Sequence, residues 1–75
     1  VNPAGDPLFE ALRDLRRELA KEAGLPPYVI FHDATLREMA ETRPANLAQL
    51  GEVGGVGSRK LAAYGEAFLA TIRQF

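Results

Sequence analysis

The sequence predicts an all-α protein, a compact bundle of four to five short helices. Apolar residues recur at steps of three and four along several segments, which places them on one face of a helix. Prolines and glycines divide the 75 residues into pieces of helical length. The one strand-like run, Val29-Ile30-Phe31, has no second strand with which to pair. We therefore expect a single helical domain over residues 8–75, preceded by a leader or linker over residues 1–7.

The composition fits one ordinary domain and excludes several classes of protein. Apolar residues make up 47% of the chain and charged residues 25%, as in globular proteins. There is no cysteine and only one histidine, so we expect neither a disulfide nor a metal site. No apolar run approaches the roughly 18 residues of a membrane span. The chain has no initiator methionine, and we expect it to be a piece of a longer protein.

The charge balance limits how the chain can meet a nucleic acid. The formal net charge is −1 and the isoelectric point is about 5.8. A dedicated nucleic-acid-binding domain has an isoelectric point above about 9. Any attraction to phosphate must therefore come from a local basic patch.

The first helix is expected from about Pro7 to Ala23. Asp6 is a capping residue and Pro7 suits the first helical position, while Gly24 is a typical helix end. The buried face is expected to carry four leucines, namely Leu8, Leu12, Leu15 and Leu19.

Two charged edges lie beside that apolar face on a helical projection. The basic edge consists of Arg13, Arg16, Arg17 and Lys21. The acidic edge consists of Glu10, Asp14, Glu18 and Glu22. The simplest interpretation is a solvated surface with pairs such as Asp14–Arg17 and Glu18–Lys21, and the alternative is that either edge binds a partner.

The segment 25–31 interrupts the helices. Pro26 and Pro27 exclude a helix interior, so we expect a tight turn or a single 3₁₀ turn that drops Ile30 and Phe31 into the core. Tyr28 follows the double proline. It is either at the surface with a partly exposed ring, or half-buried with a solvated hydroxyl.

The second helix is expected to open at His32-Asp33 and to close at about Thr42. Asp33 serves either as its cap or as a first-turn anion favoured by the helix dipole. Pro44 restricts Arg43 and so ends the helix. We expect His32 to be structural, since no nucleophile or acid partner is evident for it.

Asn46 and Gln49 resemble a capping box that begins a third, short helix, which the glycine-rich segment 54–57 ends. Ser58 is expected to cap a last helix from Arg59 to about Gln74. The inward-facing residues of the third helix are expected to be Leu47, Leu50 and Val53. Those of the last helix are expected to be Leu61, Tyr64, Gly65, Phe68, Ile72 and Phe75, with Leu69 on the border.

Catalytic constellations are nearly absent from the sequence. Ser58 is the only serine, and no serine–histidine–acid arrangement is suggested by the spacing. The glycine-rich segment is not a phosphate-binding P-loop, because Lys60 is not preceded by glycine and no strand leads into it. We expect no catalysis and no cofactor in this domain.

The glycine-rich segment does resemble the hairpin of a helix-hairpin-helix. Gly55 and Gly57 allow a sharp turn, and Val56 between them anchors it to the core. The amides that start the last helix then point outward, where an anion such as a DNA phosphate can dock. Such a site contacts the DNA backbone rather than the bases. The alternative is an interhelical turn that binds nothing. The candidate contacts are Gly55, Gly57, Ser58, Arg59 and Lys60.

Three stretches in this order resemble a known family. They are the turn Leu25-Pro26-Pro27-Tyr28-Val29-Ile30-Phe31, the helix start Asp33-Ala34-Thr35-Leu36 with Met39-Ala40, and Gly55-Val56-Gly57 followed by Lys60-Leu61, Tyr64-Gly65, Phe68 and Ile72. Over about residues 8–74 the chain resembles the HRDC domain, the helicase-and-RNase-D C-terminal module. The likeness is greatest to the HRDC domains of bacterial RecQ DNA helicases.

The resemblance implies a helical accessory domain without catalysis of its own, in a helicase of DNA replication, recombination and repair. It implies binding of single-stranded or branched DNA, or contact with the helicase core or another protein, and regulation of the helicase. The net charge of −1 departs from the DNA-binding members of the family and predicts that DNA binding is weak, and the hairpin predicts that it is directed to the DNA backbone. We expect a monomer without membrane contact, cytoplasmic and associated with the nucleoid. ATP and magnesium are expected only in the parent's helicase core.

The resemblance also points to particular residues. Tyr28 matches the tyrosine implicated in DNA contact, and Arg17, Lys21, Arg43, Arg59 and Lys60 are the basic residues that could supplement it. A base could stack on the Tyr28 ring with little sequence preference. The acidic edge of the first helix could instead meet a basic protein surface. Two alternatives remain open, namely a protein-interaction and autoregulatory module with little DNA affinity, and an accessory RNA-binding domain of an RNase D-type exonuclease.

Overall fold

The computed structural model describes residues 6–75, and in this range five helices follow one another without a strand. The helices are α1 (Pro7–Ala23), α2 (Pro27–Ile30), α3 (Asp33–Thr42), α4 (Leu47–Leu50) and α5 (Ser58–Arg73). The predicted all-α class is confirmed. Residues 1–5, most of the expected leader, lie outside the described residues.

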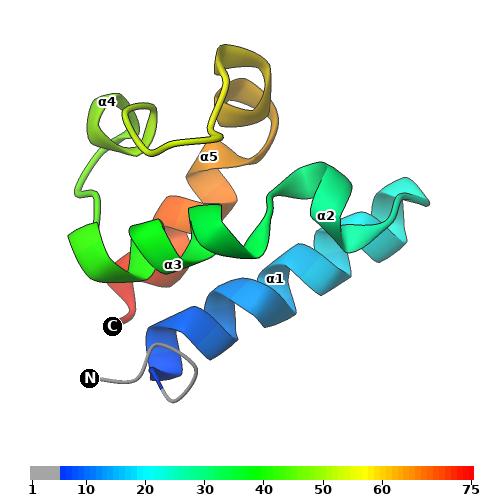
Figure 1. The fold of residues 1–75 in the computed structure, drawn as a ribbon, viewed down its shortest axis with the longest axis horizontal. Helices are drawn as coiled ribbons and strands as arrows, with labels where there is room; N and C mark the ends of the chain where they lie inside the picture. Colours follow the sequence, from blue (N-terminus) through cyan, green and yellow to red (C-terminus); the bar gives the residue numbers. More distant parts are fainter. Residues whose placement is uncertain (1–5) are drawn as a thin grey trace.

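Helix α1 is the element around which the others are arranged. It contacts α2, α3 and α5, while α4 packs against α5. Figure 1 shows α2 beside the C-terminal half of α1, and α3 returning from α2 toward the opposite end of the molecule. The largest fully buried side chains come from all five helices and from Phe31, and they are Leu8, Leu12, Ile30, Phe31, Leu36, Met39, Leu50, Phe68 and Leu69.

The bounds of α1 agree with the prediction because its end signals are local. The Asp6 carboxylate accepts a hydrogen bond from the Leu8 amide at 2.9 Å, and Pro7 occupies the first turn. Gly24 ends the helix in the left-handed conformation with φ 69°. Both ends of α1 are therefore formed by the residues that were predicted to form them.

The segment after Gly24 forms one helical turn, α2, with Pro27 in its first position. Ile30 and Phe31 are buried, as predicted. The Phe31 ring meets the Phe68 ring edge-on, with centroids 5.0 Å apart. The Tyr28 side of the turn faces outward, and 61% of Tyr28 is exposed. Of the two expectations for Tyr28, exposure at the surface is confirmed.

Helix α3 begins and ends within the predicted limits. His32 occupies the cap position without a side-chain cap, so Asp33 is the first-turn anion and not the cap. At the other end, Arg43 takes the left-handed conformation with φ 47°, directly before Pro44.

Helices α4 and α5 approach each other at a glycine. Asn46 caps α4 by accepting from the Gln49 amide, while Gln49 accepts from Ala45, one residue earlier than a standard capping box. A Cβ on Gly65 would lie 2.8 Å from a methyl of Leu47. The absent side chain therefore lets the two helices approach closely.

Three details of the predicted last helix were wrong. Ser58 is not its cap, because Gly57 occupies that position and the helix begins at Ser58 without a side-chain cap. Phe75 is half-exposed because it follows the end of the helix and does not reach the core. Leu69, placed on the border, is fully buried.

Candidate functional site

The glycine-rich hairpin between α4 and α5 is shaped by Gly55 and Val56. Val56 is buried and anchors the hairpin to the core. Gly55 has φ 90°, a conformation that side chains rarely adopt. A Cβ there would also collide with the Thr35 hydroxyl. Only glycine therefore fits position 55 without strain.

Helix α3 fixes the position of this hairpin. The buried Thr35 hydroxyl donates to the Gly54 carbonyl at 2.9 Å, and the Gly54 amide donates to the Glu38 carboxylate at 3.4 Å. Thr35 belongs to the Asp-Ala-Thr-Leu stretch, whose function was not apparent from the sequence. The two bonds hold the hairpin against α3 and leave its other side open.

That open side carries the start of α5. The first intrahelical bond runs from the Leu61 amide to the Gly57 carbonyl, so the amides of Ser58, Arg59 and Lys60 have no partner in the helical ladder. Gly55, Val56, Gly57, Arg59 and Lys60 line a shallow hollow of about 450 Å³ here. Four of the predicted contacts (Gly55, Gly57, Arg59 and Lys60) line it, and Ser58, the first residue of α5, lies between them in the sequence.

Both basic side chains at this site are available for an anion. Within residues 6–75, neither Arg59 nor Lys60 has a carboxylate within ion-pair distance. Arg59 is exposed. Lys60 is half-buried, with its ammonium 5.8 Å from the centroid of the Phe31 ring. Their charge is therefore not cancelled within the described part of the chain.

Helix α2 borders the same site. Val29 lines a second hollow of about 360 Å³ together with Arg59, Lys60, Ala63 and Tyr64 of α5. The neighbouring Tyr28 ring stacks on the His32 ring, with centroids 6.2 Å apart and planes at 24°. The turn that carries Tyr28 and the start of α5 therefore contribute to one continuous surface.

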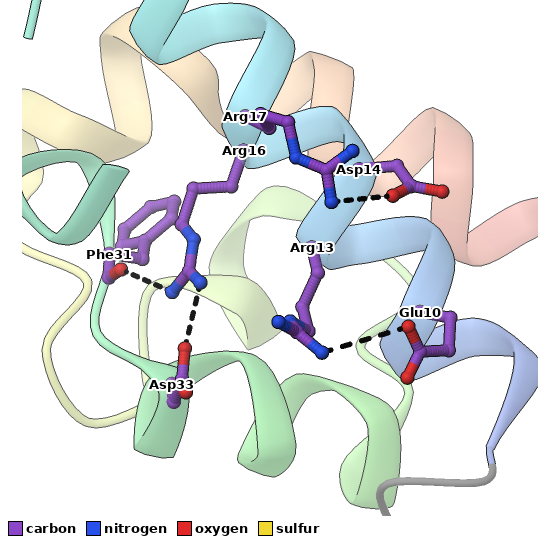
Figure 2. A network of polar contacts seen from close by, with 7 residues as sticks. All are labelled: Glu10, Arg13, Asp14, Arg16, Arg17, Phe31 and Asp33. Atoms are coloured by element: carbon purple, nitrogen blue, oxygen red, sulfur yellow. Dashed lines mark hydrogen bonds and ion pairs between the residues drawn. The ribbon is translucent and has the colours of Figure 1, made fainter. Parts of the chain in front are cut away.

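The basic edge of α1 is divided by Arg16, which turns inward. Figure 2 shows its guanidinium between Phe31 and Asp33, donating to the Phe31 carbonyl at 2.9 Å and pairing with the Asp33 carboxylate at 2.7 Å. The expectation that Arg16 lies on the surface edge was wrong. Its spacing of four from Leu12 and from Ala20, both buried, was the signal that could have placed it inside.

The remaining arginines of this edge pair with the acidic edge. Arg13 lies 3.7 Å from Glu10, and Arg17 lies 3.2 Å from Asp14 (Figure 2). The predicted Asp14–Arg17 pair is confirmed, whereas no Glu18–Lys21 ion pair forms in the described residues. All four acidic residues, namely Glu10, Asp14, Glu18 and Glu22, are exposed.

Asp33 has a carboxyl group whose pKa lies below its ordinary value. The hydrogen bond from Arg16 is the main cause, and the positive charges of Arg16, Arg13 and Arg37 add to it. Partial desolvation opposes the effect. The carboxylate form of Asp33 is thus favoured, and it ties α3 to α1 just after α2.

Neither Arg43 nor Lys21 lines the hollow at the hairpin or the one beside α2. Arg43 follows the last residue of α3, about 15 Å along the helix from its start beside α2, given a rise of about 1.5 Å per residue. Lys21 is exposed in the last turn of α1. The structure therefore gathers the hairpin residues with α2 but does not bring Arg43 to them.

No group of three or more histidine or acidic residues in the range 6–75 is placed to hold a metal ion. None of the helices described is both long and apolar enough to span a bilayer.

Comparisons with known proteins agree with this architecture. The ATP-dependent DNA helicase RecQ of Bacillus subtilis is 47% identical over 70 residues, which are 93% of this chain but only 12% of the helicase. The third HRDC domain of Deinococcus radiodurans RecQ superposes with a TM-score of 0.88 at 47% identity, covering 99% of this chain and 95% of that one. The HRDC1 domain of the same helicase is 61% identical with a TM-score of 0.63, covering 92% of each chain.

The family assignment follows from these likenesses and from a match along nearly the whole chain. The family model of the HRDC domain matches residues 6–72. The turn at Tyr28, the start of α3 and the glycine hairpin, on which the sequence resemblance was based, all lie within that range. The chain belongs to the HRDC domain family.

Proposed function

We propose that this chain is a non-catalytic accessory domain of a RecQ-type ATP-dependent DNA helicase, which helps its parent bind or select single-stranded or branched DNA. The similarity to RecQ helicases over nearly the full chain supports this parent. ATP and magnesium would act in the helicase core and not in this domain. The parent would work in the cytoplasm, at the nucleoid.

One observation carries the proposal. Unpartnered amides at the start of α5 lie beside two basic side chains, Arg59 and Lys60, that have no ion pair in the described chain. A phosphate docked there would accept from the amides and meet the positive end of the helix dipole. The Arg59 guanidinium can add a charge-assisted, bidentate contact. These contacts are made to the DNA backbone, so binding would not depend on the base sequence of the DNA.

Tyr28 adds a base contact to this backbone contact. Ile30 and Phe31 hold α2 in the core, and Arg16 holds the Phe31 carbonyl, so the turn that carries the exposed Tyr28 ring is held in place before a strand arrives. A rigid platform loses little conformational entropy on binding. Stacking one base on such a ring contributes about 1–3 kcal/mol.

Arg17 and Lys21 would have a smaller role. Arg17 is held by Asp14, and both lie among the exposed acidic residues of α1. A strand crossing this helix would meet charges of both signs, so the net attraction is small. We assign them an auxiliary, long-range contribution.

The proposal is tested by binding of the chain to a labelled single strand and to a forked duplex at low salt. Tyr28→Ala and the double variant Arg59→Ala/Lys60→Ala should each weaken binding by about tenfold or more. Tyr28→Phe keeps the ring and should bind like the parent sequence. Circular dichroism of each variant confirms that the fold is retained.

Arg43→Asn provides a control for the loss of a positive charge outside the proposed interface. It removes one positive charge at the far end of α3, and asparagine tolerates the left-handed conformation found there. We expect its affinity to change less than twofold. Absence of binding to every DNA at low salt, or an equal loss in Arg43→Asn and the hairpin variants, would rule out the proposed interface.

A second candidate function, contact with a protein, is favoured by the acidic edge. Glu18 and Glu22 are exposed and have no ion pair within residues 6–75, so they are open to a basic surface such as that of the helicase core. Glu18→Gln/Glu22→Gln in the parent helicase should then alter unwinding, while DNA binding by the separate domain at physiological salt stays the same. Unchanged unwinding would count against this second function.

A further inference from the structure

We infer that the hollow between α2 and α5 is a nucleobase subsite, which makes DNA binding selective for unpaired bases. This inference rests on the proposed function and deepens it, because it names the part of the ligand that the hollow takes. Its lining residues are Val29, Arg59, Lys60, Ala63 and Tyr64.

Part of the lining of the hollow is apolar and packs against the aromatic core. Val29 is 38% exposed, although it belongs to a turn that buries Ile30 beside it. Tyr64 lies behind it with its ring at 75° to the buried Phe31 ring, centroids 6.4 Å apart. Phe31 is in turn packed on Phe68. Exposed apolar surface backed by a fixed aromatic cluster gains free energy when a flat apolar ligand covers it.

The rim of the hollow is basic and is shared with the hairpin. Arg59 and Lys60 line this hollow and also the one at the start of α5. A phosphate bound at the α5 amides would therefore place the adjoining nucleotide next to Val29 and Ala63. A ligand that combines negative charge with flat apolar groups fits this arrangement, and a nucleic acid strand has both.

The hollow has room for one base. Its volume of about 360 Å³ lies near the lower end of the range for small-molecule sites, roughly 300–1,000 Å³. In a duplex the bases are stacked and paired, and turning one out costs a few kcal/mol. An unpaired strand does not have this cost. The subsite therefore favours single-stranded DNA over a duplex with the same number of phosphates.

The test compares three labelled ligands of equal length at low salt, namely oligothymidine, a fully abasic strand and a blunt duplex. Ala63→Leu fills the hollow on an exposed helical position. It should weaken oligothymidine binding by about fivefold or more, the equivalent of stacking one base, and leave the abasic strand unaffected. Ala62→Leu is the matched control, since residue 62 is exposed on α5 but does not line the hollow. It should bind like the parent sequence.

The outcomes separate this inference from the proposed function. If Ala63→Leu leaves oligothymidine binding intact, or weakens the abasic strand equally, the subsite is refuted while the backbone site stands. Tight duplex binding equal to that of the single strand also refutes it. Binding of an acidic, apolar peptide that Ala63→Leu abolishes, with DNA unaffected, would assign the hollow to a protein partner instead. Absence of binding to any strand overturns the proposed function and the subsite together.

Discussion

At the scale of single residues, Arg16 connects α1 to the end of the Tyr28 turn and to the start of α3. Its guanidinium reaches from α1 to the Phe31 carbonyl after α2 and to Asp33 at the start of α3. Its Nε is buried without a partner in the described chain, so this arginine is not fully satisfied even in its native position. The two bonds that it does make, to the Phe31 carbonyl and to Asp33, hold the end of the Tyr28 turn against α1 and α3.

Replacement of Arg16 should test this connection. Arg16→Met keeps a long apolar side chain but leaves the Phe31 carbonyl without its donor. We expect a loss of about 1–3 kcal/mol in the free energy of unfolding, measured by urea denaturation. Arg17→Met breaks an exposed pair on the same helix and should cost about 0–1 kcal/mol. If the two changes lower the free energy of unfolding equally, the inward position of Arg16 adds nothing to stability.

Asp33 makes part of this connection dependent on pH. The Arg16 hydrogen bond lowers the pKa of the carboxyl in the folded state below its value in the unfolded chain. A lowered pKa means that the stabilisation is fully present above the unfolded value of about 3.9 and disappears as the pH falls through the folded value. The effect is moderate because 53% of the Asp33 side chain is exposed.

The corresponding prediction concerns acid unfolding. The urea midpoint should fall as the pH is lowered from about 5 to about 3, and part of this fall should be missing in Asp33→Asn. Asp14→Asn, which removes an exposed carboxylate of α1, should keep the fall of the parent sequence. If Asp33→Asn and the parent sequence lose stability in parallel over this range, the Arg16–Asp33 contact carries no pH dependence.

At the scale of elements, the hairpin is the most tightly specified turn of the molecule. Gly55 needs a positive φ and has no room for a Cβ beside Thr35, whereas Gly57 has φ −78° and open space around it. The two glycines look equivalent in the sequence. In the structure one of them is required by the geometry, and the other only occupies the cap position of α5.

This difference predicts unequal effects of the same substitution. Gly55→Ala should lower the free energy of unfolding by about 2 kcal/mol or more, because it strains the backbone and displaces the Thr35–Gly54 hydrogen bond. Gly57→Ala should cost less than about 1 kcal/mol. Thermal and urea unfolding of the two variants measure this difference in stability. Comparable losses at both positions would mean that the hairpin is not held by Thr35.

The elements that the sequence predicted well are those with local signals. Asp6, Pro7 and Gly24 determine both ends of α1, and two adjacent prolines allow only a single turn at α2. The capping position of α5 was missed by one residue, because Gly57 adopts the extended backbone of a cap although Ser58 is the better capping residue.

The candidate site was only partly predictable from the sequence, because only some of its residues lie in local motifs. The hairpin residues and Tyr28 lie in short motifs, so the sequence could name them individually. The partners Arg16 and Asp33 are far apart in the chain, and their contact depends on how α1 packs against α3. The hollow between α2 and α5 also arises only from tertiary packing, and for that reason neither Val29 nor Ala63 was a candidate.

At the scale of the whole molecule, the charge balance sets how strongly the domain can attract DNA. The chain has ten acidic and nine basic residues, so long-range attraction is almost absent. Two of the arginines on α1 are further neutralised by acidic neighbours. Under the proposed function, binding would then come from the short-range contacts of the hairpin, and it should be weak.

The last prediction separates long-range attraction from the short-range contacts of the hairpin by their dependence on salt. Glu18→Gln/Glu22→Gln removes two of the ten acidic charges without touching the hairpin. It should raise affinity for a single strand at low salt, but the gain should vanish near 0.15 M, where the Debye length is about 8 Å. Because the gain is lost as the salt concentration rises, the slope of log affinity against log salt should be steeper below about 0.15 M, although the number of contacted phosphates is unchanged. Arg59→Ala/Lys60→Ala should instead reduce that slope by about 1.4, at about 0.7 per phosphate contact on a single strand. A gain that persists at high salt, or an unchanged slope in the hairpin variant, would mean that the strand lies along α1 and not on the hairpin.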